Sequence, residues 1–292
     1  MITAQNVSFT YPGTANPAVS VLNLTIESGE VVGLLGPSGA GKSTTQKLLI
    51  GLLRGYTGQI TAFGRDLASW GRDYYERIGV SFELPNHFQK LTARENLAYF
   101  ASLYRRASMP PAEVLAQVGL ADDANTPVEQ FSKGMKNRLS VARALQHNPE
   151  LLFLDEPTSG LDPVNARRIK DIIRARQAAG TTVFLTTHAM SVADELCDRV
   201  AFIADGQIAL IDSPRALKLR YGAPRVGVEY QGNGQLRRAD FALDGLGNNA
   251  AFLRLLREQS VQTIHTQEAT LDDIFIQVTG RSLGEAPIRA AA

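Results

Sequence analysis

A glycine-rich segment at residues 36–44 carries the strongest chemical signal in the sequence. It matches the pattern G-x-x-x-x-G-K-[ST] and consists of Gly36, Pro37, Ser38, Gly39, Ala40, Gly41, Lys42, Ser43 and Thr44. Glycines let the backbone curl until successive N–H groups point at one anion, and a helix beginning near Lys42 directs its positive end at the same place. Lys42 adds a full charge beside the β- and γ-phosphates, and the Ser43 hydroxyl is a ligand for Mg²⁺. The segment predicts a nucleoside triphosphate site. A plain helix-capping turn is disfavoured because a buried strand precedes the loop and an apolar-periodic helix follows it.

Two adjacent carboxylates, Asp155 and Glu156, follow the apolar strand at 151–154. Ligand chemistry in parallel sheets sits at the carboxyl ends of the strands. We therefore expect Asp155 to face the Mg²⁺ held by Ser43, usually through a water molecule. Glu156 is expected to act as the base that polarises the water attacking the γ-phosphate. A solvated acidic turn is the alternative, and the neighbouring phosphate loop disfavours it.

The elements that must position these groups alternate between short apolar strands and helices. Buried strands are expected at 31–36, 151–155, 182–186 and 200–204. Helical periodicity separates them, at 42–53, 92–105, 132–146, 163–178 and 190–197. This alternation predicts an α/β fold with a phosphate-loop core and a mostly parallel sheet. The first 30 residues instead alternate apolar and polar positions at 2–11 and 19–26, which predicts an antiparallel β region.

The composition limits the class of protein. The chain has 292 residues, with 30 Lys and Arg against 29 Asp and Glu. This near balance excludes a protein whose whole surface is basic and binds nucleic acid or an anionic membrane. A single cysteine, Cys197, excludes an internal disulfide and any multi-cysteine zinc site, and fits a reducing compartment. No apolar stretch approaches the roughly 20 residues of a spanning helix, and the first residues lack a signal-peptide pattern. A soluble, cytoplasmic protein is expected.

A shift in composition near Tyr221 indicates more than one domain. Glycines become frequent after it, with short strand patterns and a helical pattern at 249–259. We expect a nucleotide-binding domain at 1–220, with a helical subdomain at about 84–146. A small α+β accessory domain is expected at 222–280, and an Ala-rich flexible tail at 281–292.

The order of the motifs resembles the nucleotide-binding subunits of ATP-binding cassette (ABC) transporters, over about residues 1–220. The matching elements are the phosphate loop at 36–44, Phe-Ser-Lys-Gly-Met-Lys at 131–136, the acidic strand end, Pro-Thr-Ser-Gly-Leu-Asp at 157–162, and His188 after the strand 182–186. Each element alone is moderate evidence. The presence of all five elements in the order found in this family is strong evidence for the resemblance.

The resemblance implies two such domains packed head to tail around two ATP molecules, each with Mg²⁺. Ser132 and Gly134 of one subunit would touch the γ-phosphate bound by the other, and Asp162 would lie at the dimer contact. From the residues alone, Ser132 and Asp162 are helix N-caps, a role compatible with anion binding. The resemblance also assigns His188 to the γ-phosphate, beside the catalytic Lys42 and Glu156. It places Tyr11 against the adenine ring.

Two departures from the family pattern affect these expectations. Lys133 and Met135 replace the first Gly and the Gln of the usual Leu-Ser-Gly-Gly-Gln signature. This form, like the segment 271–280, is similar to drug and polymer export ATPases whose permease is a separate chain. The family usually has Gln after the strand corresponding to 78–82, where this chain has Glu83. A carboxylate there could face Mg²⁺ with Ser43 and Asp155, and Gln89 is the alternative occupant of the position.

The function implied by the resemblance is ATP hydrolysis coupled to transport. Closure of a dimer with a second nucleotide-binding subunit would drive an integral membrane permease at the inner face of the cell membrane, contacted through residues around 84–130. No nucleic acid partner is expected. A non-transport cassette ATPase is disfavoured because the chain has one cassette, no long heptad run and one cysteine. The signature segment and His188 disfavour a phosphate-loop kinase, whereas an importer subunit remains open.

Overall fold

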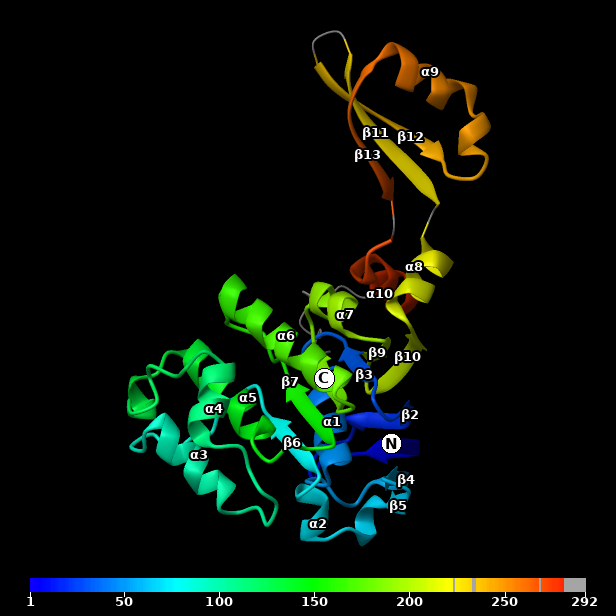
Figure 1. Ribbon diagram of the computed structural model, residues 1–292. Helices are drawn as coiled ribbons and strands as arrows, with labels where there is room; N and C mark the ends of the chain where they lie inside the picture. Colours follow the sequence, from blue (N-terminus) through cyan, green and yellow to red (C-terminus); the bar gives the residue numbers. More distant parts are fainter. Residues whose placement is uncertain (223, 233–234, 268, 281–292) are drawn as a thin grey trace. The chain divides into compact units, whose positions relative to one another are not determined.

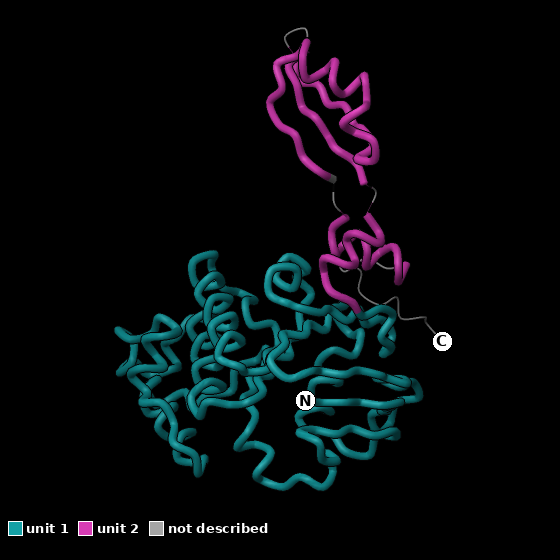
Figure 2. The backbone as a smooth tube through the Cα atoms, turned by 45° about the vertical axis from the view of Figure 1, so that its right-hand side comes forward, with its two compact units in different colours: residues 1–211, 282–292 teal, residues 212–281 magenta. Residues whose placement is uncertain are grey.

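The computed structural model describes residues 1–222, 224–232, 235–267 and 269–280 and divides the chain into two compact units. The first comprises residues 1–211 and the second begins at Asp212 (Figure 2). The second unit thus starts before the composition shift near Tyr221 and includes helix α8 (Pro214–Tyr221). The expected flexible tail at 281–292 lies outside the described residues.

A six-stranded sheet forms the centre of the first unit (Figure 1). Its strand order is β10 (Gln207–Asp212), β9 (Arg199–Ala204), β3 (Val31–Leu35), β8 (Thr182–Thr187), β7 (Leu151–Asp155) and β6 (Ile78–Ser81). The β9-β3-β8-β7-β6 ladder is parallel throughout. Every residue of β3, β7 and β8 is buried, which explains their continuous apolar sequences. The expected α/β core with a mostly parallel sheet is confirmed.

A second sheet packs beside the first and confirms the predicted antiparallel region. Its order is β2 (Val19–Ile26), β1 (Ile2–Phe9), β4 (Thr57–Ala62) and β5 (Arg65–Asp66), with antiparallel neighbours. One apolar cluster contains buried side chains of both sheets and of α1 (Lys42–Ile50), including Ile2, Leu48 and Phe153. This shared core fixes the phosphate loop, since the loop connects β3 to α1.

The helices lie where the sequence pattern predicts them, but α1 and α3 end several residues earlier than expected. α1 stops at Ile50 instead of continuing to residue 53, because Gly51 adopts the left-handed conformation that ends helices (φ 81°). α3 (Ala93–Ala101) starts at a capping box of Thr92 and Glu95 and also ends before the expected residue 105. The unit also contains the α-helices α2 (Arg72–Tyr75), α4 (Pro111–Gln117), α5 (Lys133–Leu145), α6 (Pro163–Ala178) and α7 (Met190–Leu196). Figure 1 shows α3, α4 and α5 grouped beside edge strand β6.

The second unit is a small α+β structure. Its antiparallel sheet has the order β12 (Gln235–Ala242), β11 (Arg225–Gly232) and β13 (Ser260–Gln267). Helix α9 (Ala250–Glu258) covers one face, where Phe252 packs against Val226 and Val228. α8 packs against α10 (Leu271–Thr279) through buried apolar side chains that include Ile274 and Phe275. In the described residues of either unit, no helix combines the length and apolarity that crossing a membrane requires.

Candidate functional site

The phosphate loop adopts a conformation that its glycines make possible. Gly39 and Gly41 have φ values of 82° and 105°, in the region that other residues rarely occupy. A Cβ atom on Gly36 would lie 2.2 Å from the carbonyl oxygen of Ile203, so no larger residue fits there. Gly41 is the N-cap of α1, whose first N–H groups lack intrahelical partners. The loop therefore presents backbone donors and the positive end of a helix to one anion.

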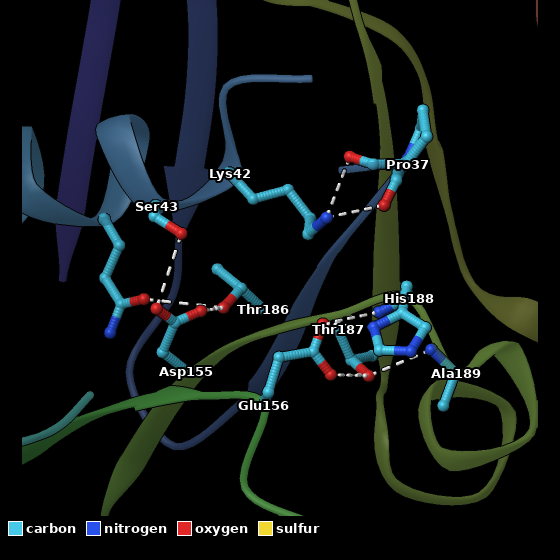
Figure 3. A network of polar contacts seen from close by, with 11 residues as sticks. Pro37, Lys42, Ser43, Asp155, Glu156, Thr186, Thr187, His188 and Ala189 are labelled. Carbon is cyan, nitrogen blue, oxygen red and sulfur yellow. Dashed lines mark hydrogen bonds and ion pairs between the residues drawn. The ribbon is translucent and has the colours of Figure 1, made fainter. Parts of the chain in front are cut away.

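Lys42 places its ammonium group within this loop. Its Nζ donates to the carbonyl oxygens of Gly36 at 2.6 Å and Pro37 at 3.0 Å (Figure 3). Burial lowers the pKa of Lys42, and the nearby carboxylates of Glu156 and Asp155 partly offset that effect. The desolvated cation is well placed to bind a phosphate group, since charge interactions are strong where water is excluded.

Asp155 lies at the carboxyl end of β7, and its two oxygens have different partners. The register of β7 and β8 puts Asp155 opposite Thr186, whose hydroxyl donates to Asp155 Oδ1. Ser43 Oγ lies 3.4 Å from Asp155 Oδ2. These are hard oxygen donors, the type that Mg²⁺ binds together with substrate phosphates. In the described part of the chain no group of three His, Cys, Asp or Glu side chains could hold a metal alone, so nucleotide oxygens would complete such a site.

Glu156 is buried, with 6% of its surface exposed, and three hydrogen bonds hold its carboxylate in place. Thr187 Oγ1 donates to Oε2 at 2.9 Å, and the backbone N–H of His188 donates to Oε1 at 2.9 Å. His188 Nδ1 lies 2.7 Å from the same Oε1. The φ of Glu156 is 48°, a strained value for a non-glycine residue. Such strain is typical of functional sites, and here the packed strand end maintains it.

A cleft of about 320 Å³ brings most of the predicted residues together. It is lined by Ser38, Gly39, Gly41, Lys42, Ser43, Thr44, Glu83, Asp155, Glu156, His188 and Ala18. Glu83 and not Gln89 lines this cleft; the Gln89 amide donates instead to the carbonyl oxygen of His87 at 3.1 Å. Gly36, Pro37 and Ala40 belong to the loop without lining the cleft.

Four further predicted residues, from outside the phosphate loop, do not line the cleft either. Ser132 caps α5 by accepting from Met135 N–H at 3.2 Å, and Asp162 caps α6 by accepting from Asn165 N–H at 3.0 Å. A Cβ on Gly134 would lie 3.3 Å from the carbonyl oxygen of Gly160, so this position favours a small residue. Tyr11 contacts the phosphate-loop helix, with its hydroxyl 3.3 Å from Thr44 Oγ1.

Sequence reasoning missed the side chains that orient the two carboxylates. Thr186 and Thr187 end β8 next to His188, and each donates to one of the acidic residues. Gln46 joins the same network, with its Oε1 3.4 Å from Thr186 Oγ1. The two threonines directly before His188 could have indicated hydrogen-bond donors near the site. Only the β7–β8 register shows that they donate to Asp155 and Glu156.

Comparisons with known proteins agree with this geometry. Residues 19–159 match the family model described as ABC transporter, and residues 224–268 match a fluoroquinolone efflux ABC transporter C-terminal domain. A fluoroquinolones export ATP-binding protein of Mycobacterium tuberculosis is 60% identical over 97% of this chain and 94% of its own. The chain belongs to the ABC transporter family.

Further relatives place this ABC ATPase among ATP-binding subunits of exporters. A daunorubicin resistance ATP-binding protein of Streptomyces coeruleorubidus is 33% identical over 90% of this chain and 91% of its own. A solved ATP-binding cassette, a dimer in a post-hydrolysis state with ADP and Pi, has a TM-score of 0.67 and 29% identity. It covers 73% of this chain and 98% of its own. The protein therefore binds nucleotide and is an ATPase subunit of an exporter.

The loop after β6, which carries Glu83, is anchored to the signature helix α5. His87 Nε2 lies 2.9 Å from the carbonyl oxygen of Lys136 and 3.1 Å from Ser140 Oγ. Arg143 donates to the carbonyl oxygen of Asn86 at 2.8 Å. Because a carbonyl only accepts, Nε2 of His87 carries the proton and Nδ1 is the bare nitrogen. Movement of α5 would thus be transmitted to the Glu83 loop.

Replacing His87 by Gln should change how stability depends on pH. Burial lowers the pKa of His87 to about 4, and its Nδ1 has no partner among the described residues. The unfolded chain binds a proton more readily than the native protein, so this residue's contribution to stability is lost as pH falls from about 6.5 to 4. The loss should reach about 3 kcal/mol in the wild type. Urea unfolding at several pH values would measure it, and parallel profiles for wild type and His87→Gln would contradict it.

Proposed function

We propose that this chain is the ATP-hydrolysing subunit of a fluoroquinolone exporter whose permease is a separate protein. One observation carries the proposal, namely the 60% identity to the mycobacterial fluoroquinolones export protein over 97% of the chain. The similarity includes the C-terminal unit, where residues 224–268 match the domain described for fluoroquinolone efflux. The match of residues 19–159 is to a model described only as ABC transporter, whereas the model matched by the C-terminal unit is described by one drug class. The C-terminal match therefore supports fluoroquinolones as the exported drugs.

Within this function, Glu156 is the base that takes a proton from the attacking water. As the water oxygen bonds to the γ-phosphorus, the bond to the bridging oxygen breaks and ADP leaves. Thr187 and His188 support this role because their hydrogen bonds fix the carboxylate. Lys42 and the loop amides stabilise charge on the transferring group. Mg²⁺, with Ser43, Asp155 and Glu83 as ligands, would supply further positive charge.

The complete site is proposed to form between two copies of the chain, with the second copy closing the nucleotide cleft of the first. Ser132 and Gly134 begin α5, and the N-terminus of a helix favours an anion. Neither residue lines the cleft of its own chain, which supports binding to the γ-phosphate held by the other copy. Asp162 would lie at this contact, and Tyr11 would stack on adenine. The dimeric form of the solved cassette supports the arrangement.

The permease is proposed to contact an exposed apolar surface beside the Glu83 loop. Its side chains are Leu84, Phe88, Tyr99 and Leu103, which are between 45% and 79% exposed. The rings of Phe88 and Tyr99 pack edge to face at 4.8 Å, so these two side chains belong to one surface. Surfaces of this kind mark protein contacts. Its place next to Glu83 supports coupling between nucleotide and transport.

ATP-driven uptake into inverted membrane vesicles tests the proposed function. Vesicles containing this chain and its permease should accumulate a fluoroquinolone when Mg·ATP is added. Vesicles with the Glu156→Gln variant should accumulate no more than vesicles without the protein. Uptake of daunorubicin but not of a fluoroquinolone would overturn the proposed drug class. Equal uptake with wild type and variant would overturn the proposed role of ATP hydrolysis.

A further inference from the structure

A second cavity, of about 550 Å³, lies in the first unit and shares no lining residue with the nucleotide cleft. It is formed around the end of α1, the strands β4 and β5, and α2, which Figure 1 shows near one another. Helix α1 starts at Lys42 in the nucleotide cleft and ends at Ile50, and its C-cap Gly51 lines this cavity. Nine helical residues place those ends about 14 Å apart. The cavity is therefore separate from the ATP site.

Aromatic side chains form the walls of this cavity. Tyr56, Trp70, Tyr74 and Tyr75 line it, and Tyr74 is only 2% exposed. The walls are held in place, because Trp70 Nε1 donates to the carbonyl oxygen of Ala62 at 3.1 Å and the Tyr74 hydroxyl donates to that of Leu49 at 2.7 Å. Fixed aromatic rings around a cavity favour a flat, unsaturated ligand, since ring contacts add to the burial of apolar area.

Two exposed arginines on the same cavity have no side-chain partner in the part of the chain that the structure describes. Arg54 and Arg72 make no hydrogen bond or ion pair to any described residue, and both line the cavity. Nearby arginines differ, because Arg77 pairs with Glu150 at 2.5 Å and Arg65 donates to Ser69 Oγ at 2.9 Å. An unpaired guanidinium next to aromatic walls matches a carboxylate, which it can bind through two parallel hydrogen bonds.

The phenol hydroxyls add donors that the protein does not use. Within the described residues, neither the Tyr56 nor the Tyr75 hydroxyl has a hydrogen-bond partner. The one carboxylate in the lining, Asp66, accepts from the N–H of Ala68 at 2.8 Å. Burial and the charge of Asp66 raise the pKa of Tyr56, so this phenol keeps its proton and remains a donor. The cavity thus offers several donors beside a single carboxylate.

We propose that this cavity binds a planar aromatic carboxylate. The ring would lie against Tyr56 and Tyr75, beside Trp70, whose own ring already contacts Arg65 at 4.9 Å. The carboxylate would face Arg54 and Arg72. An inorganic anion would leave the aromatic walls uncovered, and an uncharged ring would leave both guanidinium groups unpaired. The proposal rests on the cavity alone and holds whichever drug the transporter exports.

The only tryptophan of the chain, Trp70, lines the cavity and reports on binding. Titration of the full chain with 2-naphthoate should quench its fluorescence to saturation, while the uncharged 2-naphthamide should bind at least about tenfold more weakly. Arg54→Gln and Arg72→Gln should each weaken naphthoate binding about tenfold or more. Both side chains are exposed and have no partner within the described ranges, so neither change should affect folding. Arg94→Gln, an exposed arginine on α3, is the matched control and should bind like wild type.

Three results would overturn the proposal. The first is equal affinity for naphthoate and naphthamide, and the second is unchanged binding by a double variant that lacks Arg54 and Arg72. The third is displacement of naphthoate by Mg·ATP, which would place the probe in the nucleotide cleft. Binding that persists in the presence of ATP and depends on both arginines would support it. None of these results depends on transport, so failure here leaves the export proposal standing.

Discussion

Replacing Glu156 by Gln is expected to reduce ATP hydrolysis by about a thousandfold while ATP binding is retained. The amide keeps the size of the carboxylate but cannot accept a proton from water, and loss of a general base costs roughly 10² to 10⁴ in rate. The phosphate loop contributes the binding groups and is unchanged. Because ATP then persists, the variant should accumulate as the nucleotide-bound dimer that we propose, whose opening would require hydrolysis.

Phosphate release and size-exclusion chromatography with Mg·ATP would measure both effects. Glu27→Gln is a suitable control, because Glu27 is exposed and lies outside the cleft lining. An active Glu156→Gln protein would remove Glu156 as the base. A variant that binds ATP but stays monomeric, alone and with its permease, would contradict the composite site between two copies.

Replacing Lys42 by Ala should weaken ATP binding by at least about a hundredfold. Its ammonium is the only cation of the phosphate loop, and charge-assisted hydrogen bonds in a desolvated cleft contribute roughly 1.5 to 3 kcal/mol each. The carbonyl oxygens of Gly36 and Pro37 would also lose their donor. With Asp155 and Glu156 still in the cleft, the remaining negative charge would repel the triphosphate.

Titration with a fluorescent ATP analogue would give the affinity. Lys47→Ala is the matched control, since Lys47 lies in the last turn of the same helix and does not line the cleft. A Lys42→Ala protein with near-normal affinity would show that the loop amides alone bind the phosphates. Unchanged Trp70 fluorescence in both variants would show that the fold is intact.

The sequence identified those parts of the site that depend on neighbours in the chain. The phosphate loop requires glycine at 39 and 41 because of their backbone angles, a local requirement that a pattern records. Asp155 was expected at a strand end because the buried run before it is continuous. Helix ends were predicted less accurately: α1 stops at Ile50, although the apolar periodicity continues to residue 53. The periodicity records which side chains are apolar, whereas the backbone of one glycine ends the helix.

Contacts between distant segments were decided only by the tertiary structure. Sequence alone left Glu83 and Gln89 as alternatives, and the path of the loop after β6 brings Glu83 to the cleft. Thr187 orients Glu156 because β7 and β8 are neighbours in register, although 31 positions separate the two residues. Arg54 and Arg72 line one cavity because the chain between them turns back through the antiparallel pair β4 and β5. Local motifs depend on backbone conformation and survive as patterns in the chain. The packing of strands and loops depends on the whole core, so no short pattern encodes which distant side chains meet.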